Sequence, residues 1–303
     1  MIALVAVALV IDVVGVTSVQ HAATQGRLYG QLRQSLAEAS VPVSQVRPVE
    51  TSADEYSNAA TADARAGAGA TSATDALDGQ SKVELVPPGT PMGLLEIPSL
   101  HRKLVFVEGT ASRQTAMGPG HLRSSALPGQ SGVSVIMGHA ALYGGDFYSL
   151  PSLQVGDPIT VTTGQGRFTY VVTGHREAGD PLPPTMKPGE SRLTLTTASG
   201  TAYAPEGVLR VDARLTGKKA LDRPAVVLWP KDLSASEQAM GKDLSGLLPA
   251  IFLLQALLIA VFGVMWTWHR WGRLQTWVVG GPVITALVVV LCTQLNYYLP
   301  NLL

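Results

Sequence analysis

One stretch of the chain, residues 193–199 (Leu-Thr-Leu-Thr-Thr-Ala-Ser), alternates like a strand and ends in Ala198 and Ser199. Covalent acyl transfer needs a thiolate or an activated hydroxyl. The methyl group of Ala198 can neither attack a carbonyl nor hold an acyl group, and the hydroxyl of Ser199 attacks only if a strong base removes its proton. The only cysteine, Cys292, lies in a distant apolar run, so no thiol is expected near this stretch.

Other compositional features exclude several kinds of site. A single cysteine excludes an internal disulfide and a cysteine-rich zinc site. Twenty-two basic residues balance 22 acidic ones, so the charge gives no reason to expect a nucleic-acid partner. We expect no metal and no cofactor, because the six histidines lack the spacing of metal ligands. They are His21, His101, His121, His139, His175 and His269.

The elements that must position residues 193–199 are strands. Short β-rich runs bounded by glycine and proline fill residues 91–216 and predict an all-β closed barrel. Residues 159–161 and 168–172 flank a Gly-Gln-Gly turn at 164–166 and predict a hairpin.

Alternation predicts which side chains share a face of each strand. Ala198 shares one face with Thr194 and Thr196, and Ser199 points to the other face and starts a loop over 199–207. In the last strand, a polar face that lines a groove or is simply solvated alternates with an apolar face. The polar residues are Arg210, Asp212 and Arg214, and the apolar ones are Leu209, Val211, Ala213 and Leu215.

The two ends of the chain predict membrane segments. Residues 247–266 and 277–296 are each about twenty residues long and free of charge, which predicts a transmembrane hairpin. Arg270 and Arg273 lie in the connecting turn, so this turn is expected in the cytoplasm and the barrel outside the cell. Residues 1–17 predict an uncleaved anchor, with Asp12 near the outer interface or facing Gln255.

The remaining segments connect these parts. Residues 18–45 predict a stem helix with leucines four residues apart, and residues 46–90 are too poor in large apolar side chains to form a core, which predicts a flexible spacer. We expect a linker at 217–246, a cytoplasmic turn at 267–276 and a short extracellular tail at 297–303.

Several blocks of the barrel segment resemble the sortase family, classes C and E in particular, and follow in the family's order. They are residues 93–98 (Gly-Leu-Leu-Glu-Ile-Pro), 108–110 (Glu-Gly-Thr), 118–121 (Gly-Pro-Gly-His), 128–132 (Pro-Gly-Gln-Ser-Gly), 135–139 (Val-Ile-Met-Gly-His), then Phe147, Leu150, Leu153, Gly156 and Asp157, and finally the strand 194–198.

The resemblance implies a chemistry and a set of positions. In the family a cysteine thiolate attacks the Thr-Gly carbonyl of a sorting motif such as Leu-Pro-x-Thr-Gly, an amine resolves the acyl enzyme, and a histidine and an arginine assist. Ala198 stands in the place of that cysteine. His139, 59 residues earlier, matches the histidine better than His175, which is expected to be an exposed histidine at a strand end.

The arginine is a partial match. Arg210 lies on the expected strand, but the family commonly places its arginine where this chain has Gly207 and Val208. Arg210 and Asp212 therefore fit a shifted site or an ordinary solvated face.

Three functions follow. The first is a catalytically inactive pseudosortase, anchored in the cell membrane by several helices, that binds a sorting-type peptide of surface proteins or scaffolds other membrane subunits through its hairpin. The alternative is a peptidase or transpeptidase that uses Ser199 with His139. The third is a purely structural module of a membrane complex.

Overall fold

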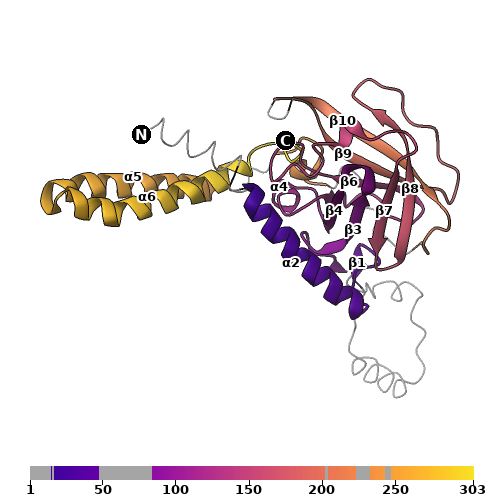
Figure 1. Ribbon diagram of the computed structural model, residues 1–303, viewed down its shortest axis with the longest axis horizontal. Helices are drawn as coiled ribbons and strands as arrows, with labels where there is room; N and C mark the ends of the chain where they lie inside the picture. Colours follow the sequence, from indigo (N-terminus) through magenta and orange to yellow (C-terminus); the bar gives the residue numbers. More distant parts are fainter. Residues whose placement is uncertain (1–14, 16, 48–83, 202–203, 223–232, 243–246) are drawn as a thin grey trace, which may run out of the picture.

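Eight strands form the centre of the protein and close on one another. The computed structural model describes residues 15, 17–47, 84–201, 204–222, 233–242 and 247–303. The strand order around the barrel is β10-β8-β7-β3-β4-β5-β6-β9, with β9 and β10 paired to close it (Figure 1). The strands are β3 (Pro91–Ile97), β4 (Arg102–Glu108), β5 (Gly120–His121), β6 (Gly132–Met137), β7 (Pro158–Thr163), β8 (Gly166–Arg176), β9 (Ser191–Thr201) and β10 (Ala204–Thr216).

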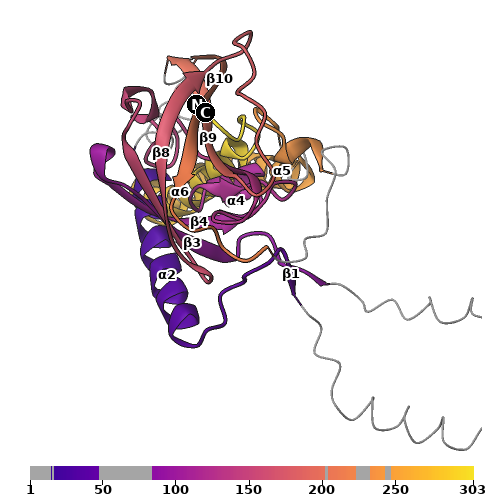
Figure 2. The same cartoon turned by 90° about the vertical axis from the view of Figure 1, so that its right-hand side faces the viewer.

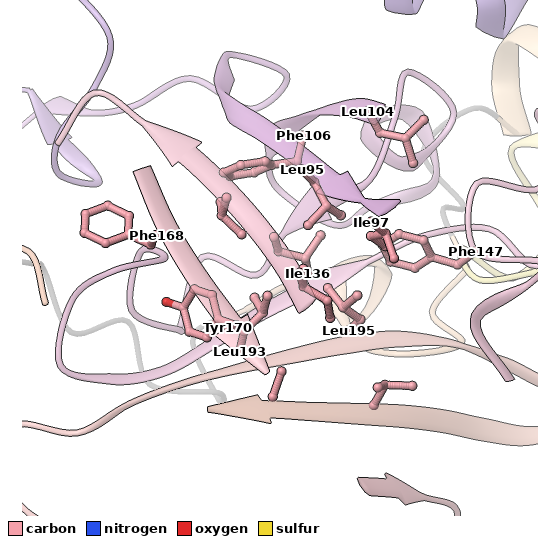
Figure 3. Close-up of a cluster of buried hydrophobic side chains, with 14 of the residues drawn as sticks. Leu95, Ile97, Leu104, Phe106, Ile136, Phe147, Phe168, Tyr170, Leu193 and Leu195 are labelled. Atoms are coloured by element: carbon pink, nitrogen blue, oxygen red, sulfur yellow. The ribbon is translucent and has the colours of Figure 1, made fainter. Parts of the chain in front are cut away.

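The inside of the barrel holds the main apolar core, which confirms the expected all-β closed barrel. Figure 3 shows side chains from most strands meeting there. The Tyr170 hydroxyl is satisfied within the core, because it accepts a bond from Gly129 N at 2.6 Å and lies 3.0 Å from Ser191 Oγ. Fully buried members include Leu95, Phe106, Ile136, Phe147, Tyr170, Leu193 and Leu195.

The register of β9 agrees with the alternation seen in its sequence. Leu193 and Leu195 point into the core, and the opposite face carries Thr194, Thr196 and Ala198. On one side β9 pairs in parallel with β6, which sets Met137 beside Thr196. On the other side it pairs with β10, which sets Val208 beside Ala198.

Two details of β9 and β10 differ from the expected pattern. The loop expected at 199–207 is largely strand, because Ser199 pairs with Gly207 and Thr201 with Ala204. The polar face of β10 is not uniformly solvated, because Asp212 is buried. The expected hairpin of β7 and β8 is present, with Ile159 opposite Tyr170.

The helix α2 (Thr17–Ala37) lies along the flank of the barrel (Figure 1). Leu28 and Leu32 are buried against Val105 and Val107 of β4, whereas Leu36 remains exposed. This contact makes α2 part of the barrel's packing. The expected anchor at residues 1–17 lies outside the described residues except for Gly15 and Thr17.

The segment expected as a spacer is partly structured at its two ends. Strand β1 (Val46–Arg47) pairs with β2 (Glu84–Leu85), and Val86 is buried in the barrel core. The central part, residues 48–83, lies outside the described residues.

The helices α5 (Leu247–Trp271) and α6 (Arg273–Asn296) project together from the barrel, side by side (Figure 1). Both are long and apolar enough to cross a membrane, over Leu247–Arg270 and Val278–Asn296. They approach closely at Gly280, where an added Cβ would lie 2.5 Å from Val264 Cγ2. Glycine at this point therefore permits the close contact between the helices.

The residues that follow α6 return to the barrel. In Figures 1 and 2 the C-terminal end of the chain lies against the barrel beside β9, away from the far end of the helical hairpin. Asn301, Leu302 and Leu303 are all buried. The segment 297–303, expected to be a short tail, is a packed part of the structure.

Candidate functional site

Ala198 lies on the outer face of β9 in an apolar cluster. It packs with Met137 of β6 and with Leu302, and Val208 of β10 adjoins them. Leu302 is fully buried there and Ala198 is 8% exposed. The position that the sequence assigned to a nucleophile is therefore occupied by a methyl group, in contact with the segment 297–303.

Two hydrogen bonds hold the histidine loop against this strand. Gly138 N donates to Thr196 O at 3.0 Å, and Thr197 Oγ1 donates to Gly138 O at 3.0 Å. Gly138 must lack a side chain, because an added Cβ would lie 2.7 Å from the Phe147 ring. The next residue, His139, is thereby placed beside the outer face of β9.

His139 is buried, with 2% of its surface exposed. Its Nδ1 lies 2.9 Å from the main-chain oxygen of Leu303, and because that oxygen can only accept, Nδ1 carries the proton. Nε2 has no hydrogen-bond partner among the described residues. The Tyr143 ring lies against the imidazole, with centroids 4.9 Å apart.

Burial lowers the pKa of His139 from 6.5 to about 4, and the hydrogen bond to Leu303 only partly opposes this effect. At neutral pH the ring is therefore neutral, with a free lone pair on Nε2. A neutral imidazole can accept a proton, but no described nucleophile is hydrogen-bonded to this nitrogen.

Ser199 follows Ala198 on β9 and is half-buried. It pairs with Gly207, whose added Cβ would lie 3.1 Å from Ser199 Oγ. Both Ala198 and Ser199 line an open cleft of about 400 Å³, together with Tyr148 and His175. No hydrogen bond joins Ser199 to His139 within the described part of the chain, so the structure does not show the two as a nucleophile and base pair.

Arg210 lies on the same face as Ala198, between Thr196 of β9 and Arg176 of β8 in the register. It makes no hydrogen bond or ion pair with the residues that the structure describes. Arg176 does, because its guanidinium binds the Asp212 carboxylate through two nitrogens. Thr194 Oγ1 donates to the same carboxylate at 2.7 Å, which explains why Asp212 is buried.

This pairing gives the Gly-His-Arg sequence at 174–176 a structural role. Arg176 ties β8 to β10, and His175 is exposed, as expected for it. His175 stands at the boundary between the cleft beside Ala198 and a second cleft of about 580 Å³, which is lined also by residues of the loop at 181–187.

Two buried pairs, each made of a histidine and a carboxylate, lie in the structure around the site. His121 Nδ1 lies 3.0 Å from Glu108 Oε2, and His21 Nε2 lies 2.9 Å from Asp146 Oδ1. Burial lowers the pKa of each histidine, but the adjacent carboxylate and a hydrogen bond to a main-chain oxygen together outweigh burial and raise the pKa of both. The His121 pair joins β4 to β5, and the His21 pair joins α2 to the loop after His139.

The described residues hold no cluster of three or more His, Cys, Asp or Glu side chains that could bind a metal ion. Cys292 is buried in the contact between α5 and α6, remote from the barrel core.

The segment 297–303 is part of the site although it was expected to be only a short extracellular tail. The available signal was the three leucines Leu299, Leu302 and Leu303, which follow the long apolar run 277–296, because a group of apolar side chains favours burial.

Comparison with known proteins shows which family the barrel is similar to. The family model of the sortase domain matches residues 95–212. Sortase D of Bacillus subtilis (strain 168) is 29% identical over 133 residues, which cover 42% of this chain and 66% of that protein. The chain thus spans just under two thirds of this relative.

Solved structures give the same kind of match. A Sortase D5 transpeptidase of Clostridium perfringens is 18% identical, with a TM-score of 0.43, over 64% of this chain and 99% of that one. Sortase E1 of Streptomyces coelicolor, solved with a tripeptide in its active site, is 26% identical, with a TM-score of 0.39, over 44% and 91%.

Proposed function

Because residues 95–212 form a sortase-family domain, we propose that this protein is a pseudosortase, a membrane-anchored protein that binds a peptide of surface proteins or of surface-assembly components without cutting it. The residue that carries the proposal is Ala198, at the position that the resemblance assigns to the nucleophile, because its methyl group cannot attack a carbonyl.

The surroundings of Ala198 support a protein that lacks catalytic activity but keeps the folded binding surface. The fold around it is complete, since β6, β9 and β10 are in register and His139 is fixed by the Gly138 bonds. The cluster of Ala198 with Met137 and Val208 is apolar, which suits binding of an apolar side chain better than stabilisation of a thiolate.

The segment that fills this face supports a peptide as the ligand class. Residues 299–302 read Leu-Pro-Asn-Leu, so they begin with the Leu-Pro pair of a sorting motif and place Leu302 where the motif has threonine. Leu302 is the residue that packs on Ala198. A sorting-type peptide is therefore the ligand that we expect this face to accept.

The membrane arrangement completes the proposal. The helices α5 and α6 cross the cell membrane, Arg270 and Arg273 face the cytoplasm, and the barrel lies outside the cell, where surface proteins are assembled. The hairpin is also the surface through which other membrane subunits would dock.

The test uses the full chain in lipid nanodiscs with a fluorescent Leu-Pro-x-Thr-Gly peptide and an amine acceptor. We expect saturable binding and no cleaved or transferred product. Product formation that is lost in Ser199→Ala would instead establish the serine mechanism, and absence of binding to wild type and to a variant lacking residues 299–303 would leave the purely structural role.

A further inference from the structure

The segment 297–303 is bound to the barrel through its main chain. Ala140 N donates to Leu302 O at 2.9 Å, and Leu142 N donates to Leu303 O at 3.1 Å, the oxygen that His139 Nδ1 also binds. The segment itself is turned, because Leu303 N donates to Pro300 O at 3.1 Å. Main-chain bonds to the barrel hold a peptide independently of its side chains. We refer to Met137, His139, Ala140, Leu142 and Ala198 as the His139 face.

Side-chain contacts add selectivity to the main-chain bonds. Leu302 fills the apolar space over Met137 and Ala198, and Leu303 packs in a separate cluster with Leu142 and Tyr143. Both leucines are buried. The two clusters therefore act as two side-chain pockets for neighbouring residues of one peptide.

Asn301 fixes the position of the segment along this surface. Its Nδ2 lies within hydrogen-bond distance of three main-chain oxygens, at 2.6 Å from Thr110, 2.9 Å from Gln238 and 3.3 Å from Ser236. Its own main-chain N donates to Gly241 O at 3.0 Å. A slip of one residue would break these bonds, so the segment has a defined register.

The bound segment leaves polar atoms of this surface unpaired. His139 Nε2 and Thr196 Oγ1 are buried and have no hydrogen-bond partner among the described residues. Thr196 is the register partner of Met137, on which Leu302 packs. Buried polar atoms without partners cost free energy, so a ligand that brings a polar group to these two atoms would gain an interaction that the segment does not supply.

We propose that the segment 297–303 is a ligand held in cis on the His139 face, and that a peptide from another protein binds only when this segment is released. The inference rests on the proposed peptide-binding function and adds its regulation. The segment starts directly after Asn296, the last residue of α6, so a displacement of the hairpin from the barrel pulls the segment off the face.

Tethering makes the segment an effective competitor. A segment that follows α6 without a linker is present at an effective concentration of the order of millimolar. If the segment has an intrinsic dissociation constant of about 0.1 mM for this face, a free peptide would bind about tenfold more weakly to the intact chain than to one whose segment is released.

The first arm of the test asks whether the segment occupies the face. Hydrogen exchange is measured on the full chain in nanodiscs, for wild type, Leu302→Asp and the milder Leu302→Ala. We expect the Ala140 and Leu142 amides to exchange at least tenfold faster in Leu302→Asp and by an intermediate amount in Leu302→Ala. The Gly138 amide, which is bonded to Thr196 within the barrel, should keep its protection and so reports that the barrel is folded.

The matched control is Leu221→Asp, because Leu221 is 76% exposed and lies outside the face. It should leave the exchange of Ala140 and Leu142 unchanged. Equal exchange of these amides in wild type and Leu302→Asp, with Gly138 still protected, would overturn the inference.

The second arm uses a synthetic peptide of residues 297–303 as the probe, added to a variant that lacks residues 299–303. It should restore protection at Ala140 and Leu142, and the same peptide with aspartate in place of Leu302 should not. No restoration by the native peptide would also overturn the inference. If it restores protection while a Leu-Pro-x-Thr-Gly peptide binds no variant, the cis ligand is supported and the proposed function fails.

Discussion

His139 and Leu303 are 164 residues apart in the chain and meet through a 2.9 Å hydrogen bond between Nδ1 and the main-chain oxygen. This bond fixes the proton on Nδ1 and leaves the lone pair on Nε2. His139, which the resemblance matches to the family histidine, is therefore covered by the segment 297–303.

The pKa of His139 should show whether the segment 297–303 covers its ring. Burial holds its pKa at about 4, so an NMR titration of histidine-labelled full chain should show one ring that stays neutral down to pH 5. In Leu302→Asp the pKa should rise toward 6.5, because water reaches the ring. An ordinary pKa near 6.5 in wild type would contradict the buried arrangement.

The same shift makes stability depend on pH. The unfolded chain binds a proton at His139 below about pH 6.5 and the folded chain only below about pH 4. His139 therefore adds stability that is complete above pH 6.5 and is lost as the pH falls toward 4, by about 3 kcal/mol in all. The difference in unfolding free energy between wild type and His139→Gln, measured at pH 7 and pH 4 in detergent, should change by this amount.

The contribution of the Glu108 and His121 pair to stability should change with pH in the opposite direction. The pKa of His121 is raised, so its stabilisation is complete below about pH 6.5 and is lost as the pH rises through the folded value. Glu108→Gln should destabilise the protein by about 3 kcal/mol at pH 6 and by less at pH 9, because it leaves the buried imidazolium without its partner.

The control for this pair is Glu206→Gln, since Glu206 is exposed and outside the core. Chemical denaturation at both pH values should show a change below 0.5 kcal/mol for it, a value typical of surface substitutions. If Glu108→Gln lowers the free energy of unfolding equally at both pH values, the pair contributes through packing and not through its charge.

We expect the Asp212 carboxylate to stabilise the fold. Asp212→Ala leaves the half-buried Arg176 and the buried Thr194 without their shared acceptor, so we expect a loss of about 3 kcal/mol in unfolding free energy. Asp180→Ala, at an exposed turn, should cost less than about 1 kcal/mol. Equal losses would show that the carboxylate contributes no more than a surface turn.

The close approach of the two apolar helices α5 and α6 can be tested at two glycines. Gly280→Leu should separate α5 from α6, because an added side chain meets Val264, and should lower the thermal midpoint in detergent by an amount that corresponds to about 2 kcal/mol. Gly263→Leu should have little effect, because nothing lies within 4 Å of its added Cβ. The reverse order of effects would place the helix contact elsewhere.

The local part of the fold could be predicted because side-chain alternation fixes it. The two-residue alternation of side chains placed Ala198 with Thr194 and Thr196 on one face of β9. Charge-free runs long enough to span a membrane predicted the helices α5 and α6. Order of motifs along the chain favoured His139 over His175, and this preference remains a prediction. Gly138, the neighbour of His139, is bonded to Thr196 and Thr197 of β9, whereas His175 lines the cleft beside Ala198.

Contacts between distant segments could not be predicted from pattern alone. The burial of Asp212 depends on Arg176 of the neighbouring strand β8, and pairing of Ser199 with Gly207 extends a strand through an expected loop. The position of Leu302 on Ala198 depends on the return of the chain from α6 to the barrel, which no local periodicity encodes.

The central claim, that this face binds peptide but forms no acyl intermediate, is tested most directly by intact-mass measurement after incubation of the full chain with a Leu-Pro-x-Thr-Gly peptide. Wild type, Leu302→Asp and Ser199→Ala should all keep their own mass, and Leu302→Asp combined with Ala198→Cys should gain the mass of the acyl fragment. An acyl adduct on wild type that disappears in Ser199→Ala would contradict the account, because it would show that the chain still carries a working nucleophile.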